Sequence, residues 1–244
     1  MIRLIAVGFS LLAANLVSAQ DVAAVATKAQ SAFLTGNAAE LSRLSSSTAS
    51  WSKSQNATEL YTYAYVQFRA LQLAIATKNE REAERAGDAC SDTLDLLLKR
   101  DPKSAEGHAL QSACYGYLAN LGGMGAIRNG SRSGKSIEAA LALDARNPRV
   151  VLIDGFGVYF RPKFVGGDKA KGCARFKAAA ASFESAASSA VVSPAGVNWG
   201  AAESHYWSGR CARDAGDTAG ARKEFERALA LAADFSAAAK ALGR

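Results

Sequence analysis

Large apolar residues recur at helical spacing through most of this 244-residue chain. In the clearest case they follow one another at steps of three or four residues, which places them on one helical face: Tyr61, Tyr65, Phe68, Leu71 and Ile75. Asn56 precedes this segment and offers an N-cap, and a second helical segment runs from about Glu80 to Lys99. Asp101-Pro102 ends that segment, because proline disfavours a helical residue before it. The pattern therefore predicts a pair of antiparallel helices.

The same kind of pattern continues toward the C-terminus as three further helix pairs and a last helix. The pairs are expected over about residues 103–145, 150–192 and 197–232, and the last helix from Ser236. The second pair is interrupted at Gly122-Gly123-Met124-Gly125, so that its second helix is expected only from Ser136 to Ala145.

The N-terminal part of the chain has a different pattern. Residues 20–45 form two short alanine-rich helical segments, divided near Thr35-Gly36-Asn37. The following stretch, 45–55, is rich in serine and threonine and is typical of a linker. We therefore expect N-terminal helices and a linker over residues 20–55, before a repeat domain over residues 56–244.

Composition strengthens the helical prediction. Hydrophobic residues make up 49% of the chain, but much of this is alanine, and there are only four prolines. Alanine is the best helix former, and its small side chain lets helices approach closely. We expect an all-α fold, an α-solenoid of about four helix hairpins with a capping helix at its C-terminal end.

One set of residues occurs twice in the second half of the chain. The two copies have identical internal spacings and consist of Gly167, Asp168, Phe176 and Ala179, and of Gly216, Asp217, Phe225 and Ala228. They lie 49 residues apart, which indicates stacked copies of one helical unit.

The helices around the second copy resemble a tetratricopeptide repeat (TPR). That motif has small residues in both helices and a large apolar residue between them, and its matching positions here are Gly209, Ala221, Phe225 and Ala228. The match is incomplete, because His205, Ala212 and Ala233 stand where the motif has two aromatic residues and a proline. The resemblance implies a non-catalytic scaffold that binds a protein or peptide along the concave side of its first helices.

In such repeats the ligand binds to one face of the first helix of each pair. In the fourth helix pair of this chain, the matching positions lie on one face of the predicted helix and are Glu203, Tyr206, Arg210 and Arg213. Arginine and tyrosine suit binding, because each combines contact area with directional hydrogen bonds.

A second resemblance gives an alternative function. The turn from Pro162 to Asp168, with Trp199-Gly200 further on, is similar to exported bacterial repeat proteins associated with TRAP-type solute transport. This likeness covers only about the last 100 residues. It implies a periplasmic small-molecule-binding component of a transport system, with its ligand between the helix pairs around Tyr159, Phe164 and Trp199.

The first twenty residues have the layout of a cleavable secretory signal. Arg3 precedes a mostly apolar run from Leu4 to Val17, and small residues precede Gln20. The run is about 14 residues long, shorter than the roughly 20 needed to cross a bilayer, although an uncleaved anchor is the alternative. We expect residues 1–19 to be removed and the protein to be exported, periplasmic or secreted, and soluble. Charged residues interrupt every later apolar stretch, so no transmembrane segment is expected in the mature chain.

Four cysteines in an oxidising compartment allow three disulfide connectivities. Cys90 and Cys114 fall on consecutive predicted helices, and so do Cys173 and Cys211. Because neighbouring helices in a hairpin stack bring such positions within reach, we predict the pairs 90–114 and 173–211. The alternative is that all four are small buried residues that stay reduced.

Positive charge is concentrated in one part of the chain. Residues 128–177 contain eleven lysines and arginines and four acidic residues. The net charge of this segment is therefore +7, the same as that of the whole sequence. Such a field attracts an anionic partner, so an acidic protein or peptide is expected, and Arg161 and Lys163 are further binding candidates. The alternative is a solvated basic face that only maintains solubility. Nucleic acid is not an expected partner in the exported compartment.

Several motifs suggest chemistry at first but do not support it. The segment from Gly130 to Ser136 resembles a phosphate-binding loop. A P-loop, however, has four residues between its glycines and follows a strand, whereas only three residues separate Gly130 from Gly134. We therefore expect this segment to be a flexible basic loop. His108 and His205 each precede a cysteine by six residues, which leaves the two side chains about 120° apart on a helix. We therefore expect no metal site, no cofactor and no catalytic residue.

Overall fold

The structure is a computed structural model that describes residues 10–185 and 193–244. In chain order its helices are α1 (Ser10–Thr35), α2 (Ala38–Ser47), α3 (Ala57–Ala76), α4 (Glu80–Arg100), α5 (Ala105–Asn120), α6 (Ala126–Asp144), α7 (Pro148–Phe160), α8 (Lys169–Ser185), α9 (Ala201–Asp214), α10 (Thr218–Leu231) and α11 (Ser236–Ala241). Two short 3₁₀ segments, η1 (Ala49–Lys53) and η2 (Lys163–Val165), lie in the connections. No strand occurs within the described residues.

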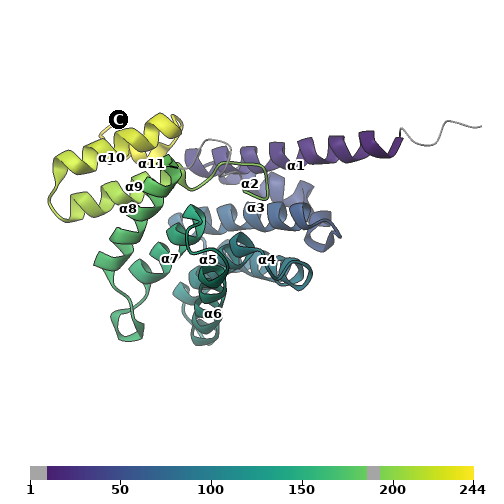
Figure 1. Ribbon diagram of the computed structural model, residues 1–244, viewed down its shortest axis with the longest axis horizontal. Helices are drawn as coiled ribbons and strands as arrows, with labels where there is room; N and C mark the ends of the chain where they lie inside the picture. Colours follow the sequence, from purple (N-terminus) through teal and green to yellow (C-terminus); the bar gives the residue numbers. More distant parts are fainter. Residues whose placement is uncertain (1–9, 186–192) are drawn as a thin grey trace, which may run out of the picture.

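The helices form a stack of four hairpins (Figure 1). The hairpins are α3–α4, α5–α6, α7–α8 and α9–α10, and each one also contacts the next hairpin in the chain. This arrangement confirms the all-α stack of hairpins expected from the sequence. The short α11 contacts α10 and α1, so it lies at the end of the stack, as expected for a capping helix.

Glycine opposite an aromatic ring explains how the later hairpins close. A side chain at Gly209 of α9 would come within 2.7 Å of the Phe225 ring of α10. Gly155 of α7 faces Phe176 of α8 in the same way, at 2.8 Å. Both rings are fully buried, so each one fills the space that its glycine leaves between the paired helices.

The repeated Gly-Asp pair performs two functions. Asp168 and Asp217 each accept a hydrogen bond from a backbone N–H three residues on, and so cap α8 and α10. Gly216 has a φ of +83°, which glycine adopts without strain. Gly167 does not have a positive φ; a side chain there would collide with the carbonyl oxygen of Arg161.

Helix α6 corrects one sequence expectation. It begins at Ala126 rather than at Ser136, so the stretch expected to be a flexible basic loop is helical. The Ser112 hydroxyl of α5 donates to the Ser133 carbonyl, and the Ser133 hydroxyl donates to the Ser112 carbonyl, both at 2.9 Å. These contacts with α5 outweigh the low helix propensity of a segment that holds two glycines.

The N-terminal helices connect the two ends of the stack. The chain turns between α1 and α2 at Gly36, which has a φ of +76°, at the expected division. Helix α1 packs on α3 and also reaches the turn between α10 and α11, where the Ser31 hydroxyl donates to Asp234 at 2.9 Å (Figure 1). The Ser236 hydroxyl of α11 donates to the Leu34 carbonyl at 2.8 Å. The stretch expected to be a linker includes η1, which contacts α3 and α4.

The expected signal peptide is only partly within the described residues. Residues 1–9 lie outside them, and α1 begins at Ser10. Cleavage after residue 19 therefore stays a prediction. None of the described helices combines the length and apolar character that a membrane span requires.

Both predicted disulfides are present. Cys90–Cys114 joins α4 to α5, and Cys173–Cys211 joins α8 to α9. The first bond therefore links the first hairpin to the second, and the other links the third to the fourth. We call α3–α6 and α7–α10 the two halves of the stack, and the contact between α5–α6 and α7 the central joint. No disulfide crosses the central joint, because all four cysteines are used within the halves.

Candidate functional site

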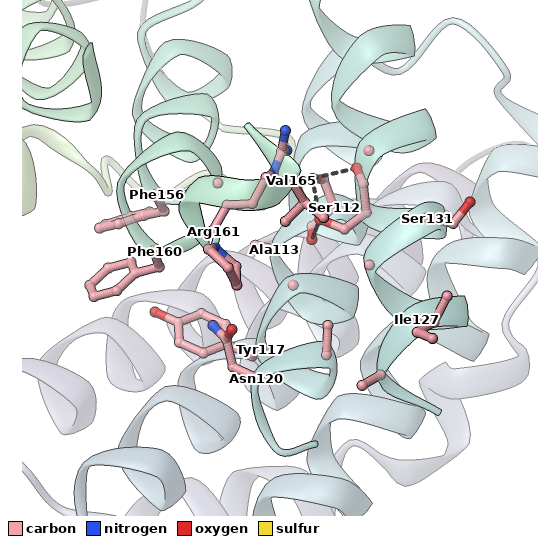
Figure 2. Close-up of a pocket in the computed structure, with 18 of the residues that line it drawn as sticks. Ser112, Ala113, Tyr117, Asn120, Ile127, Ser131, Phe156, Phe160, Arg161 and Val165 are labelled. Carbon is pink, nitrogen blue, oxygen red and sulfur yellow. Dashed lines mark hydrogen bonds between the residues drawn. The ribbon is translucent and has the colours of Figure 1, made fainter. Parts of the chain in front are cut away.

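An open apolar cleft of about 510 Å³ lies at the central joint (Figure 2). Its walls come from α5, α6, the C-terminal part of α7 and the loop after α7. This volume lies within the range of small-molecule and anchor-residue pockets. We call this space the central cleft.

The central cleft exists because glycine and serine occupy much of the α6 face turned toward it. Ile127, Gly130, Ser131 and Gly134 line it at helical spacing. A Cβ atom added at Gly134 would have no heavy atom within 4 Å, and one at Gly130 would only just reach Ala119. Since neither glycine nor serine fills the space, α7 and α6 stay apart there.

The polar groups on the floor of the cleft bond to each other. Ser112 and Ser133 pair reciprocally across α5 and α6, as Figure 2 shows. Their hydroxyls are therefore satisfied without a ligand. The remaining wall includes Ile153 and Phe156 of α7. The interior thus favours an apolar occupant.

Large apolar side chains stand exposed at the mouth of the cleft. Ile127 at the start of α6 and Phe164 in η2 are both 89% exposed and both line it. Val165 beside Phe164 and Met124 in the α5–α6 turn are exposed as well. Exposed apolar groups that adjoin an apolar cavity are typical of a surface that contacts a partner or ligand.

Arg161 is the only charged residue among the described residues that line the central cleft. It follows the end of α7, and its guanidinium group lies between Gly157 and Gly166, since Cβ atoms built there would be 3.8 and 4.0 Å from its two terminal nitrogens. Lys163, the other basic candidate of this loop, is exposed between the lining residues Pro162 and Phe164.

Several other cations in the basic segment face acidic groups. Buried Arg149 pairs with Glu106 at 3.0 Å, and Arg175 pairs with Asp154 at 2.8 Å. Burial raises the pKa of the Asp88 carboxyl on α4, and Arg128 is close enough to oppose part of that rise. Arg149 is therefore used inside the protein and does not add to an exposed basic face.

Glu203 and Tyr206, two of the candidates on α9, line a second space of about 350 Å³, which is bounded by residues of α1, α3, α5, α7, α9 and α11. We call it the inner groove; α1 and the C-terminal segment around α11 cover part of it, because Phe33 and Phe235 are among its lining residues. Glu203 is buried and forms an ion pair with Arg69 of α3 at 2.5 Å. Its carboxylate is therefore used inside the protein, whereas the Tyr206 side chain is half-buried.

Gln30 and Tyr65 complete the network around the Arg69–Glu203 pair. The Gln30 amide donates to Glu203 at 3.1 Å and its oxygen accepts from Arg69 at 2.6 Å, while Arg69 also donates to the Tyr65 hydroxyl at 3.0 Å. Burial alone would raise the pKa of Glu203, but Arg69 and the bonds from Gln30 and Gly200 hold it below its ordinary value. Burial raises the pKa of Tyr65 to about 12.

The other two candidates on α9 lie outside both spaces. The guanidinium group of Arg210 lies 4.4 Å from the centre of the Trp207 ring, and Arg213 is exposed. His205, which stands at an aromatic position of the motif, is buried and bonds to the Glu224 carboxylate at 2.7 Å. The structure therefore does not gather the four α9 candidates into one surface.

The residues proposed around a small-molecule site are also separated. Phe164 lines the central cleft, Trp199 lines the inner groove, and Tyr159 is buried between α7 and α8. Tyr117 and Phe156 line both spaces, so the cleft and the groove are neighbours.

Sequence reasoning missed Ile127 and Gly134 as site residues. The signal available was a large apolar residue at the edge of a glycine-rich stretch, followed by glycines at helical spacing. The same glycines and basic residues over 130–136 also match a flexible loop, which conceals this signal in the sequence.

Among the described residues, no group of three or more His, Cys, Asp or Glu side chains could hold a metal ion.

No protein-family model matches this sequence, and no curated protein matches it. Among solved structures, the chain is similar to the crystal structure of a thermophilic TPR protein from Thermus thermophilus. The two are 14% identical, the match covers 85% of this chain and 89% of that one, and the TM-score is 0.49. The described part of this chain is an all-α stack of helical hairpins. The hairpins themselves, rather than this likeness, establish the fold.

Proposed function

We propose that this protein is a non-catalytic binding module of the bacterial cell envelope, and that it receives an apolar segment of a partner protein in the central cleft. The observation that carries the proposal is the pair of exposed side chains, Ile127 and Phe164, at the mouth of an apolar cavity. A buried apolar anchor, surrounded by contacts that exclude water, is the usual source of binding energy in protein interfaces.

The chemistry of the cleft supports binding rather than catalysis. Among the described residues that line it, there is no histidine, carboxylate, cysteine or lysine, so no side chain there can act as a general base near neutral pH. The two disulfides support an oxidising, exported location, because such bonds are rare in the cytosol.

Filling the cleft from α6 tests this function directly. In Gly134→Leu the new side chain should occupy the space beside α7, which no neighbouring atom now fills. Because leucine is also a better helix former than glycine, the variant should be at least as stable as the wild type, by up to about 1 kcal/mol. A displayed library of random peptides, each about 12 residues long, should yield binders to the wild-type protein, and these should lose at least about tenfold in affinity for the variant.

Ala142→Leu is the matched control. Ala142 is exposed about two turns further along the same helix, so the substitution adds the same side chain without reaching the cleft. Peptides that bind Gly134→Leu and wild type equally well would contradict the assignment of the cleft. Thermal unfolding of both variants, followed by circular dichroism, would separate lost binding from lost folding.

A small-molecule carrier serving a solute transport system is the second candidate. The volume of the central cleft favours it, since about 510 Å³ suits a compact apolar ligand. Native mass spectrometry of protein purified from its own host should then show an adduct in the wild type and in Ala142→Leu, but not in Gly134→Leu. An adduct-free wild type that still binds peptides would favour the protein-binding module.

A further inference from the structure

We infer that the central cleft selects a partner segment in which an acidic side chain lies next to the apolar anchor, and that Arg161 binds this carboxylate. The inference rests on the proposed function and specifies the partner of the same site. Its basis is that the described residues lining the cleft carry one positive charge and no negative charge.

The described residues that line the cleft include one cation and no anion. Arg161 has no carboxylate of the described chain within salt-bridge distance, whereas Arg149, Lys171 and Arg175 in the same basic segment each have one. Internal ion pairs therefore involve three cations of this segment. Arg161 is one of the others, and among the described residues it is the only one of them that lines the cleft.

The position of Arg161 suits a bidentate contact. It directly follows Phe160 at the end of α7, and its backbone N–H donates to the Gly157 carbonyl, which fixes the start of the side chain. The two glycines beside its guanidinium group contribute no side chains that would block access from the cleft. A planar guanidinium group binds a carboxylate through two parallel hydrogen bonds, so it distinguishes Glu or Asp from Gln or Asn.

Arg161 and one side of the apolar mouth come from the same loop. Phe164 and Val165 follow Arg161 by only three and four residues, in the short η2 turn. A segment that placed a large side chain between Phe164 and Ile127 would bring its neighbouring residue to the loop that holds Arg161. Glutamate at that neighbouring position would have its carboxylate matched by the only charge that the described residues place on the cleft wall.

The test uses the best-binding peptide from the library, synthesised with acetylated and amidated ends, and with Glu, Gln or Lys beside its apolar anchor. The wild-type protein should bind the Glu peptide about tenfold more tightly than the Gln peptide, and the Lys peptide most weakly, as measured by fluorescence anisotropy. Raising NaCl from about 0.05 to about 0.5 M should reduce the difference between Glu and Gln.

Arg161→Gln should remove the preference for Glu while changing the affinity for the Gln peptide by less than about twofold. Arg161→Glu should make the Lys peptide the preferred one. Arg146→Gln is the matched control, because it removes the same charge from an exposed position beyond the opposite end of α6. This control should keep the preference of the wild type.

The outcomes separate this inference from the proposed function. If the three peptides bind the wild type equally, or if Arg161→Gln keeps the preference for Glu, the inference is wrong while the binding module stands. If no library peptide binds but dodecanoate does, in a manner that depends on Arg161, the occupant is a small amphiphilic carboxylate and both protein-partner statements fail. Dodecanol, which lacks the charge, serves as the comparison for dodecanoate.

Discussion

Removal of both disulfide bonds should destabilise the protein by about 6–8 kcal/mol, which is about half or more of the total free energy of unfolding expected for a protein of this kind. The bonds close loops of 24 and 38 residues, and cross-links of this size restrict the unfolded chain by about 3–4 kcal/mol each. Proteins of this kind have a total free energy of unfolding of only about 5–15 kcal/mol. Urea unfolding of the Cys90→Ala, Cys114→Ala, Cys173→Ala, Cys211→Ala variant should show the loss.

The two pairs can be separated by removing one at a time. Each double variant, with one bond retained, should lose about half of the total and should respond to dithiothreitol by losing the rest. The wild type should unfold at lower urea with dithiothreitol than without it. Mass mapping that found four free thiols in the protein purified from its host would contradict the prediction, and so would equal urea midpoints with and without reductant.

Glu203→Ala should have the second largest effect, a loss of about 3–5 kcal/mol in the free energy of unfolding. The substitution leaves the Arg69 guanidinium group buried without its carboxylate, at only 1% exposure. The pair also joins the first hairpin to the fourth, so we expect α1 and α11 to lose protection in hydrogen exchange before the rest of the stack.

An exposed ion pair gives the matched control. Arg222 and Glu226 of α10 lie 3.0 Å apart but are largely exposed, so Glu226→Ala should change stability by less than about 1 kcal/mol. The double variant Arg69→Met, Glu203→Leu should be much closer to the wild type than Glu203→Ala, because it leaves no unpaired buried charge. A loss in Glu203→Ala no greater than that in Glu226→Ala would show that the buried pair does not hold the ends together.

The same pair predicts a pH dependence of stability. The pKa of Glu203 in the folded protein lies below its ordinary value of 4.5, so its ionised form favours folding. This contribution is complete above the unfolded pKa and is lost as pH falls through the lower, folded pKa. The difference in unfolding free energy between wild type and Glu203→Gln should therefore be constant near neutral pH and should shrink in strongly acidic buffer. A difference that grew as pH fell would contradict this sign.

Local sequence patterns were enough to predict the hairpins. Each of the signals used acts within a few residues of the helix face or helix end that it determines. These signals are the apolar positions of α3, the Gly-Asp turn before α10, and Pro102 and Pro148. The disulfides could be predicted for the same reason, since consecutive helices in such a stack are neighbours. The beginning of α6 could not, because Ser112 of α5 stabilises a segment whose own composition disfavours a helix.

The sequence by itself determined that this chain folds into helical pairs, which pairs follow one another, and which cysteines meet. Tertiary structure alone decided that Glu203 is buried against Arg69, 134 residues away in the chain. It also decided that Arg161 lies on the wall of a cleft lined by no carboxylate of the described chain, and that two glycines of α6 leave this cleft open. The physical reason is that pairing and burial depend on where distant helices pass, whereas helix formation depends mainly on neighbours within one turn.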